Sequence, residues 1–144
     1  MNYEYKNIVL AIDGSDASDK AFEKAIHLVK RNNAHLILAH VIDSRTFATA
    51  EAYDRSLAER AEDFAKDLVE SYVKKAMEYG LENISQCIEY GSPKIKLAKE
   101  IASRFNADII ICGATSKNAV ERFLIGSVSE SITRYAICDV LVVR

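Results

Sequence analysis

The sequence is poor in the features that mark secreted, membrane-spanning and nucleic-acid-binding proteins. Its 144 residues include three cysteines, Cys87, Cys112 and Cys138, and no CxxC pair. An odd and widely spaced set argues against a disulfide framework, so we expect a reducing, cytoplasmic location. The formal net charge of −2 gives no basic surface for a nucleic acid. The chain also has neither a signal-peptide pattern nor an apolar run near the roughly 18 residues of a membrane span.

Several catalytic and nucleotide-binding motifs are missing as well. The sequence contains no GxxxxGK[ST] loop, no GxGxxG fingerprint and no GxSxG elbow, which argues against a classical P-loop, a dinucleotide site and a serine hydrolase. His27, His35 and His40 follow no ligand pattern such as HExxH, so we expect solvated histidines and no protein-held metal. Cys112 has no evident basic partner, and we interpret it as a buried strand residue rather than a nucleophile.

Apolar residues, 49% of the chain, are concentrated in five stretches with strand character. Near-continuous runs such as DIIIC and VLVV are typical of parallel strands covered on both faces. The third stretch is shorter and alternates in polarity, as an outer strand would. The predicted strands are Asn7–Asp13, Ala34–Val41, Ile84–Tyr90, Ala107–Gly113 and Asp139–Arg144.

Helical periodicity follows each of the first four strands. The second helix is predicted to carry one apolar stripe, made of Leu57, Ala61, Phe64, Ala65, Leu68, Tyr72 and Ala76. Ser92, as N-cap, and Pro93, the only proline, predict the start of the third helix, and Asn106 its end. The last helix covers about 128–136. The connection at about 42–55 is long for this arrangement, so it is either a lid or an extension of the second helix.

The strict alternation of strands and helices predicts one doubly wound α/β domain over residues 1–144. We expect a five-stranded parallel sheet with helices on both faces and the strand order 3-2-1-4-5. In such a sheet, ligands bind beyond the carboxyl ends of the strands, at the point where the strand order reverses. That point lies between the first and fourth strands, where Asp13 and Gly113 leave the sheet.

The stretch Gly113–Ser127, GATSKNAVERFLIGS, lies at this expected crevice, and its composition suits a phosphate. Gly113 would allow the backbone to turn sharply and approach a ligand closely. Gly126 and Ser127 precede the last helix, whose free N–H groups favour an anion. Further candidate donors are the hydroxyl groups of Thr115, Ser116, Ser127 and Ser129. An ordinary loop that ends in a serine N-cap is the competing interpretation.

The chain resembles the universal stress protein family over essentially its whole length. NIVLAIDGSDASDKAF resembles that family's opening strand and helix, GSPKIKLAKEIASRFNADIIICGATS its third helix and fourth strand, and GSVSESITRYAICDVLVVR its ending. The resemblance implies a UspA-like domain of the Rossmann-like, adenine nucleotide alpha hydrolase-like type. Nucleotide-binding members of the family have a loop of Gly, two residues, Gly, nine residues, Gly, then Ser or Thr. Gly113, Gly126 and Ser127 match this loop, and Ser116 replaces its second glycine.

The same resemblance implies an ATP site, with any Mg²⁺ held mainly by the phosphates. Asp13 matches the acidic residue that contacts the nucleoside, and a cap of the following turn is its alternative role. Val41 matches the residue whose backbone meets adenine, and a plain core valine is the alternative. The predicted cofactor-binding residues are Ala11, Ile12, Asp13, Val41, Gly113, Ser116, Gly126, Ser127, Val128 and Ser129. No catalytic residue is predicted.

The function implied is that of a cytoplasmic, ATP-binding stress-response sensor or regulator with little or no catalysis. A dimeric interaction module without nucleotide is one alternative, which Ser116 favours, and a slow ATP hydrolase is another. The apolar last strand lacks an internal charge or proline, and Asp139 stands where the family often has proline. We therefore predict a homodimer through Val140, Leu141, Val142 and Val143, an arrangement common in the resembled family.

Overall fold

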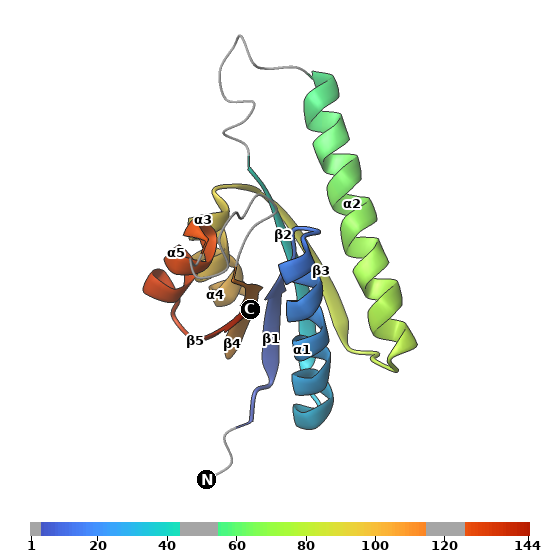
Figure 1. Ribbon diagram of the computed structural model, residues 1–144, viewed down its shortest axis with the longest axis vertical. Coiled ribbons are helices and arrows are strands. Elements are labelled where there is room, and N and C mark those ends of the chain that lie inside the picture. The colour runs from blue at the N-terminus through green and yellow to red at the C-terminus, as the bar shows by residue number, and fades with distance from the viewer. Residues whose placement is uncertain (1–3, 44–54, 115–125) are drawn as a thin grey trace.

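The computed structural model of the chain describes residues 4–43, 55–114 and 126–144 (Figure 1). Its sheet consists of β1 (Asn7–Ala11), β2 (His35–Asp43), β3 (Ile84–Gly91), β4 (Ile109–Gly113) and β5 (Asp139–Val143). All neighbouring strands run parallel, in the order β3-β2-β1-β4-β5. The predicted fold class and strand order are therefore confirmed, and β3 is an outer strand as expected.

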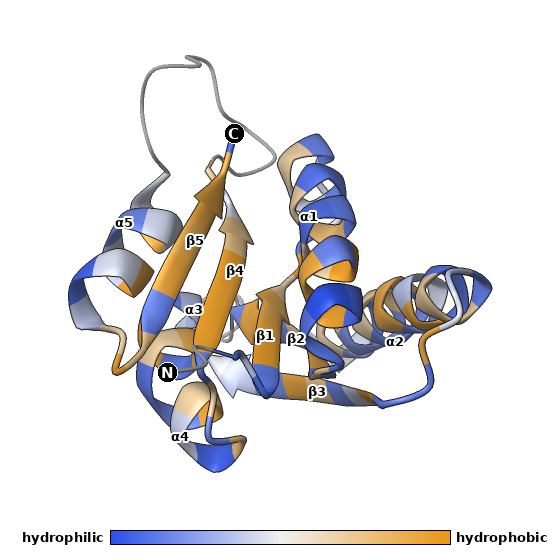
Figure 2. Cartoon of the chain, turned by 90° about the horizontal axis from the view of Figure 1, so that it is seen from below, coloured by the Kyte–Doolittle hydropathy of each residue, from blue (hydrophilic) through white to orange (hydrophobic). Residues whose placement is uncertain are grey.

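The helices form two layers, one on each face of the sheet. They are α1 (Asp16–Asn32), α2 (Arg55–Glu78), α3 (Pro93–Ile95), the π-helical segment η2 (Lys96–Ile101), α4 (Ala102–Arg104) and α5 (Ser127–Tyr135). Figure 2 shows α1 and α2 on one side of the strands and α3, α4 and α5 on the other. None of the helices in the described segments is long and apolar enough to span a membrane.

The central strand β1 is buried on both faces. Ile8 and Leu10 pack into the layer of α1 and α2, whereas Val9 between them packs into the layer of η2, α4 and α5. All three side chains are fully buried, and each contributes roughly 1.5–3 kcal/mol of hydrophobic stabilisation. Because β1 pairs with β2 on one edge and β4 on the other, the carboxyl ends of these three strands are held side by side. This fixes the edge of the sheet at which a ligand would bind.

The third helical segment departs from the single regular helix that the sequence predicts. Ser92 is extended and Pro93 begins the helix, but the Ser92 side chain makes no capping hydrogen bond. The segment then continues as the π-helical η2 before it returns to α-helix in α4. Asn106 ends it with a positive φ of 51°, as predicted. Neither composition nor periodicity predicts a π-helical turn, and such turns are frequent beside functional sites.

The predicted apolar stripe of α2 is only partly buried. Ala65, Tyr72 and Ala76 are at most 2% exposed, but Leu57 and Phe64 are 44% and 46% exposed. Figure 1 shows the reason, because the first turns of α2 extend past the ends of β2 and β3. The first part of the stripe is therefore exposed, and the later part packs into the core.

Candidate functional site

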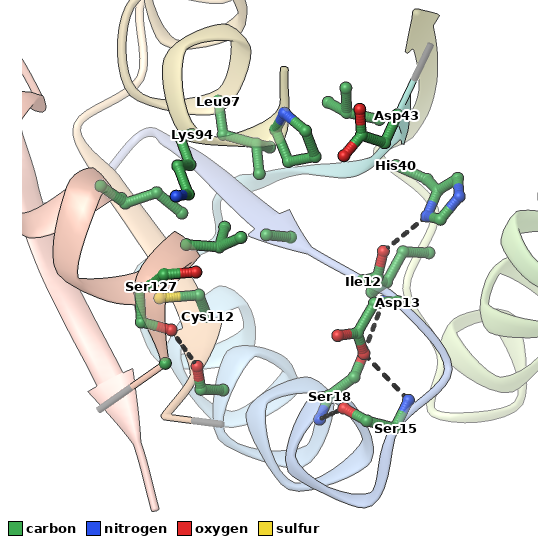
Figure 3. Close-up of a pocket in the computed structure, with 18 residues that line it drawn as sticks. Ile12, Asp13, Ser15, Ser18, His40, Asp43, Lys94, Leu97, Cys112 and Ser127 are labelled. Carbon is green, nitrogen blue, oxygen red and sulfur yellow. Dashed lines mark hydrogen bonds between the residues drawn. The ribbon is translucent and has the colours of Figure 1, made fainter. Parts of the chain in front are cut away.

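A cavity of about 390 Å³ lies at the carboxyl ends of β1, β2 and β4, next to the first turns of α3 and α5 (Figure 3). Its position is the point at which the strand order reverses, where ligands bind in open α/β sheets. Its volume lies in the usual range for small-molecule sites. Nine of the predicted site residues line it: Ala11, Ile12, Asp13, Val41, Gly113, Gly126, Ser127, Val128 and Ser129. The tenth, Ser116, lies outside the described residues.

The turn between β1 and α1 is held by three reciprocal hydrogen bonds. The Ser15 N–H donates to Asp13 Oδ1 at 2.9 Å, and the Ser18 N–H donates to Ser15 Oγ at 3.1 Å. The Asp13 N–H donates in turn to Ser18 Oγ at 3.2 Å. Asp13 therefore has the turn-capping role that was one of its two predicted roles. Since a carboxylate accepts about four hydrogen bonds, the group retains acceptor capacity toward the cavity.

His40 also lines the cavity, which the sequence analysis did not predict. Its Nδ1 lies 2.8 Å from the carbonyl oxygen of Ile12 and must donate, because a carbonyl only accepts. Its ring also meets Phe64 of α2 edge to face at 6.2 Å between centroids. His35 is likewise half-buried, with Nε2 at 2.6 Å from Ser85 Oγ, whereas His27 is exposed. The expectation of solvated histidines was thus wrong for two of the three.

Close packing between α1 and β4 requires a glycine at position 113. A Cβ atom there would lie 2.7 Å from both the carbonyl carbon and the Cβ of Ala17, in the first turn of α1. That distance is shorter than real Cβ contacts, so only glycine lets α1 approach β4 this closely. Gly113 also lines the cavity, so the predicted close approach of its backbone to a ligand stays a prediction beside this packing role.

The start of α5 presents backbone N–H groups to the cavity. Gly126, not a serine, is the N-cap, with φ −62° and ψ 155°. Its own N–H donates to the Ala114 carbonyl at 2.7 Å, and the first intrahelical bond runs from Glu130 N–H to Gly126 O. The N–H groups of Ser127, Val128 and Ser129 have no partner among the described residues. The competing interpretation of a serine N-cap is therefore wrong, and these groups are available to an anion.

The Ser129 hydroxyl is not a free donor. It donates to the Gly113 carbonyl at 2.5 Å and ties α5 to the end of β4. The ends of the 115–125 connection also meet, because Gly126 N–H bonds to Ala114 O. Thr115, the other hydroxyl donor predicted in this connection besides Ser116, lies outside the described residues.

The cavity has acidic side chains on one side and a basic side chain on the other. Asp13 and Asp43 line one side together with His40, and Lys94 lines the opposite side near Ser127 (Figure 3). The start of α5 adds the positive end of a helix dipole to the Lys94 side. A ligand with donor groups at one end and an anion at the other matches this distribution.

The thiol of Cys112 also lines the cavity, but we interpret it as unreactive. Cys112 is 4% exposed, and burial raises the pKa of its thiol, although a hydrogen bond with Ser129 acts in the opposite direction. The thiol therefore stays protonated at neutral pH, as expected for a buried strand cysteine. Within the described segments, no group of three or more His, Cys, Asp or Glu side chains is arranged to hold a metal ion.

Comparison with known proteins decides the family. The sequence profile of the universal stress protein family matches residues 4–144. The chain belongs to the universal stress protein family. A Staphylococcus haemolyticus protein assigned to the universal stress proteins is 46% identical over 140 residues, which span 97% of this chain and 85% of the relative.

Solved structures agree with this assignment. Universal stress protein UspA from Lactobacillus plantarum superposes with a TM-score of 0.88 at 30% identity, covering 99% of this chain and all of UspA. A universal stress protein in complex with cAMP has a TM-score of 0.75 at 24% identity, with 97% of both chains covered. The Archaeoglobus fulgidus universal stress protein in complex with dAMP has a TM-score of 0.73 at 18% identity, with 97% and 98% covered. The last two establish a shared fold, and both are complexes with adenine nucleotides.

Proposed function

We propose that the chain binds ATP in this cavity and acts as a cytoplasmic, nucleotide-dependent regulator of the stress response with little or no catalysis. The observation that carries the proposal is the group of N–H groups at the start of α5 that find no partner in the described part of the chain. They line a cavity at the strand-order reversal. A helix N-terminus favours an anion by roughly 0.3–2 kcal/mol through its dipole, in addition to the hydrogen bonds. That adenine nucleotides occupy two similar universal stress proteins supports the choice of ligand.

Each part of ATP has a matching part of the cavity. Adenine would lie against the backbone at Val41 and at the carboxyl end of β1, near Ala11 and Ile12. There, a hydrogen bond from His40 orients the Ile12 carbonyl. The Asp13 carboxylate would accept hydrogen bonds from the ribose hydroxyls. The triphosphate would accept hydrogen bonds from the backbone N–H groups of Ser127, Val128 and Ser129. Any Mg²⁺ would be coordinated mainly by the phosphates.

The same residues explain why we propose little catalysis. Hydrolysis needs a group that orients or deprotonates a water molecule beside the γ-phosphate. Asp13 caps its own turn, His40 is bonded to the Ile12 carbonyl, and burial keeps the Cys112 thiol protonated. None of these described groups is placed near the start of α5 as a free general base. A slow ATP hydrolase therefore remains the weaker alternative.

Calorimetric titration of the purified protein with ATP–Mg²⁺, ADP, AMP and GTP tests the proposal. We expect saturable, one-to-one binding of adenine nucleotides and weaker binding of GTP, whose base presents different hydrogen-bonding groups. Heat denaturation followed by chromatography of the supernatant would detect nucleotide that co-purifies. Absence of binding at millimolar ATP would refute the proposal and favour an interaction module without nucleotide. Steady phosphate release lost on mutation of the α5 start would instead favour the hydrolase.

We also propose that the protein is a homodimer through β5. Val140, Leu141 and Val142 are only half-buried in the single chain, and β5 forms the open edge of the sheet beside β4. Pairing of this edge with a second copy would satisfy its outer backbone groups. The cytoplasmic location is supported by the three cysteines, which are all free.

A further inference from the structure

A lysine side chain forms the wall of the cavity opposite its acidic end. Lys94 is the second residue of α3, which begins where β3 ends, and α3 packs against α5. Its side chain lines the cavity and is half-buried. Figure 3 shows its ammonium group directed toward the side of the cavity that holds Ser127 and the start of α5.

Lys94 differs from Lys96 and Lys99 because, among the residues that the structure describes, its ammonium group has no partner. The Lys96 ammonium donates to Glu100 Oε2 at 2.6 Å, and Lys99 lies 5.5 Å from the centre of the Tyr135 ring. No ion pair or hydrogen bond joins Lys94 to any described residue. An ammonium group that is partly withdrawn from water without a partner loses hydration, and a bound anion would compensate for that loss.

Two independent elements therefore direct positive charge at one region of the cavity. The start of α5 contributes backbone N–H groups, and α3 contributes the positively charged ammonium group of Lys94. The backbone groups supply directional hydrogen bonds, whereas lysine acts on phosphate as a point charge on a flexible stem. The carboxylates of Asp13 and Asp43 are on the opposite side, so an anion would be excluded there and attracted here.

We propose that Lys94 is a phosphate-binding residue that makes the site selective for nucleoside phosphates over nucleosides. This proposal rests on the proposed function, since it assigns a specificity-determining residue within the same nucleotide site. Because the contribution of Lys94 is chiefly coulombic, it increases with the charge of the phosphate chain and decreases as salt screens it. ATP is therefore the preferred ligand, and adenosine gains nothing from Lys94.

The test compares Lys94→Gln with the matched control Lys96→Gln, in which the lysine removed is the one already paired with Glu100. Calorimetric affinities for ATP, AMP and adenosine, each measured from low to moderate salt, separate the contributions. We expect Lys94→Gln to weaken ATP binding about tenfold or more, the usual range for a charged hydrogen bond, and to leave adenosine unaffected. The salt dependence of ATP binding should become shallower. Lys96→Gln should match the wild type, and Lys94→Arg should retain most of the affinity.

Three results would overturn the proposal. If Lys94→Gln binds ATP as tightly as wild type, with an unchanged salt dependence, the proposed nucleotide site stands and only the role of Lys94 is wrong. If adenosine and ATP lose affinity equally, Lys94 supports the structure of the cavity and does not bind phosphate. If the wild type binds no adenine nucleotide, the proposed function fails and the role of Lys94 fails with it.

Discussion

Asp13, just after β1, has an observed structural role and a proposed role in binding. Its Oδ1 accepts the Ser15 N–H and so shapes the turn into α1, while the carboxylate also lines the cavity. The two roles depend on different properties of the side chain. The turn needs only an acceptor oxygen, which an amide supplies as well, whereas binding of ribose hydroxyls benefits from a negative charge.

Substitution of Asp13 by asparagine and by alanine should separate these roles. Asp13→Asn keeps an acceptor for Ser15 N–H, so we expect the free energy of unfolding to stay within about 0.5 kcal/mol of wild type, while ATP affinity falls about tenfold. Asp13→Ala should lose both affinity and about 1 kcal/mol of stability. Urea unfolding and calorimetry measure the two effects, and binding of inorganic triphosphate serves as the control that neither change should affect. Unaltered ATP affinity in Asp13→Asn would show that Asp13 only caps the turn.

Three cavity-lining residues, Gly113, His40 and Lys94, differ in whether the sequence alone could predict their position at the cavity. A glycine after an apolar strand marks a special backbone position, and the cavity does include Gly113. Glycine is needed at this position because a Cβ atom would collide with the backbone of Ala17. A contact between segments so distant in the chain leaves no local sequence pattern. His40 and Lys94 follow no motif, and they line the cavity only because parallel strands end at the same edge.

The sequence predicted the types and the order of the helices and strands better than it predicted where each one ends and its local geometry. Near-continuous apolar runs identified the inner strands, because a parallel sheet buries both faces of its strands, and alternating polarity identified the outer strand β3. The π-helical η2 was missed because the spacing of Leu97, Ala98 and Ile101 is also compatible with an α-helix. The exposure of Leu57 and Phe64 was missed because apolar periodicity cannot tell how far a helix extends past the sheet.

The N-terminus of α5 offers a prediction in which stability and binding change in opposite directions. Gly126 has the φ and ψ of an ordinary N-cap residue but has no side chain to accept a helical N–H. In Gly126→Ser, the hydroxyl oxygen would accept from the N–H of Val128 or Ser129 and stabilise α5 by ~0.3 kcal/mol. The same bond competes with phosphate, so ATP affinity should fall several-fold.

Urea unfolding and calorimetry on Gly126→Ser and Gly126→Ala test this prediction. Alanine adds a methyl group but no acceptor, so it leaves the N–H groups of α5 open to phosphate and controls for added volume. Equal loss of ATP affinity in both variants would mean that bulk near the ligand, not competition for N–H groups, explains the effect.

The contact between α2 and the β1–α1 turn leads to a pH-dependent prediction. The Tyr72 hydroxyl donates to the Asp19 carboxylate and accepts from Ser18 Oγ at 3.2 Å, and Ser18 Oγ in turn accepts the Asp13 N–H. Burial, followed by the hydrogen bond to Asp19, raises the pKa of Tyr72 well above its ordinary value of 10.0. The unfolded chain therefore loses this proton first as pH rises, and deprotonation favours unfolding.

Tyr72→Phe should consequently cost about 1–2 kcal/mol at neutral pH, because it removes the hydroxyl and leaves the edge-to-face contact with Phe22 in place. The contribution of the hydroxyl to the free energy of unfolding is complete below pH 10 and declines above it. Urea unfolding of wild type and Tyr72→Phe at pH 8, 9, 10 and 11 should therefore show a stability difference that is constant and then shrinks. A difference that grows above pH 10 would contradict the raised pKa.

At the scale of the whole molecule, the open edge of the sheet determines how two copies can associate. The Ala114 N–H donates to the Val143 carbonyl at 2.7 Å, so the backbone groups of Val143 face β4. Because consecutive residues of a strand direct their N–H and C=O groups to opposite edges, those of Val142 and Val140 face away from β4. A two-fold axis at Leu141 would pair Val140 of one chain with Val142 of the other in an antiparallel ladder.

This geometry makes Val142→Pro a sharp test of the dimer. Proline removes an N–H that points to the open edge and leaves the hydrogen bonds between β4 and β5 intact, and edge strands tolerate proline. We expect the wild type to sediment at twice the chain mass at micromolar concentration and Val142→Pro to sediment as a folded monomer. In Leu141→Pro, the lost N–H faces β4, so this control should destabilise the fold itself. A monomeric wild type, or a Val142→Pro variant that remains a stable dimer, would exclude pairing through β5.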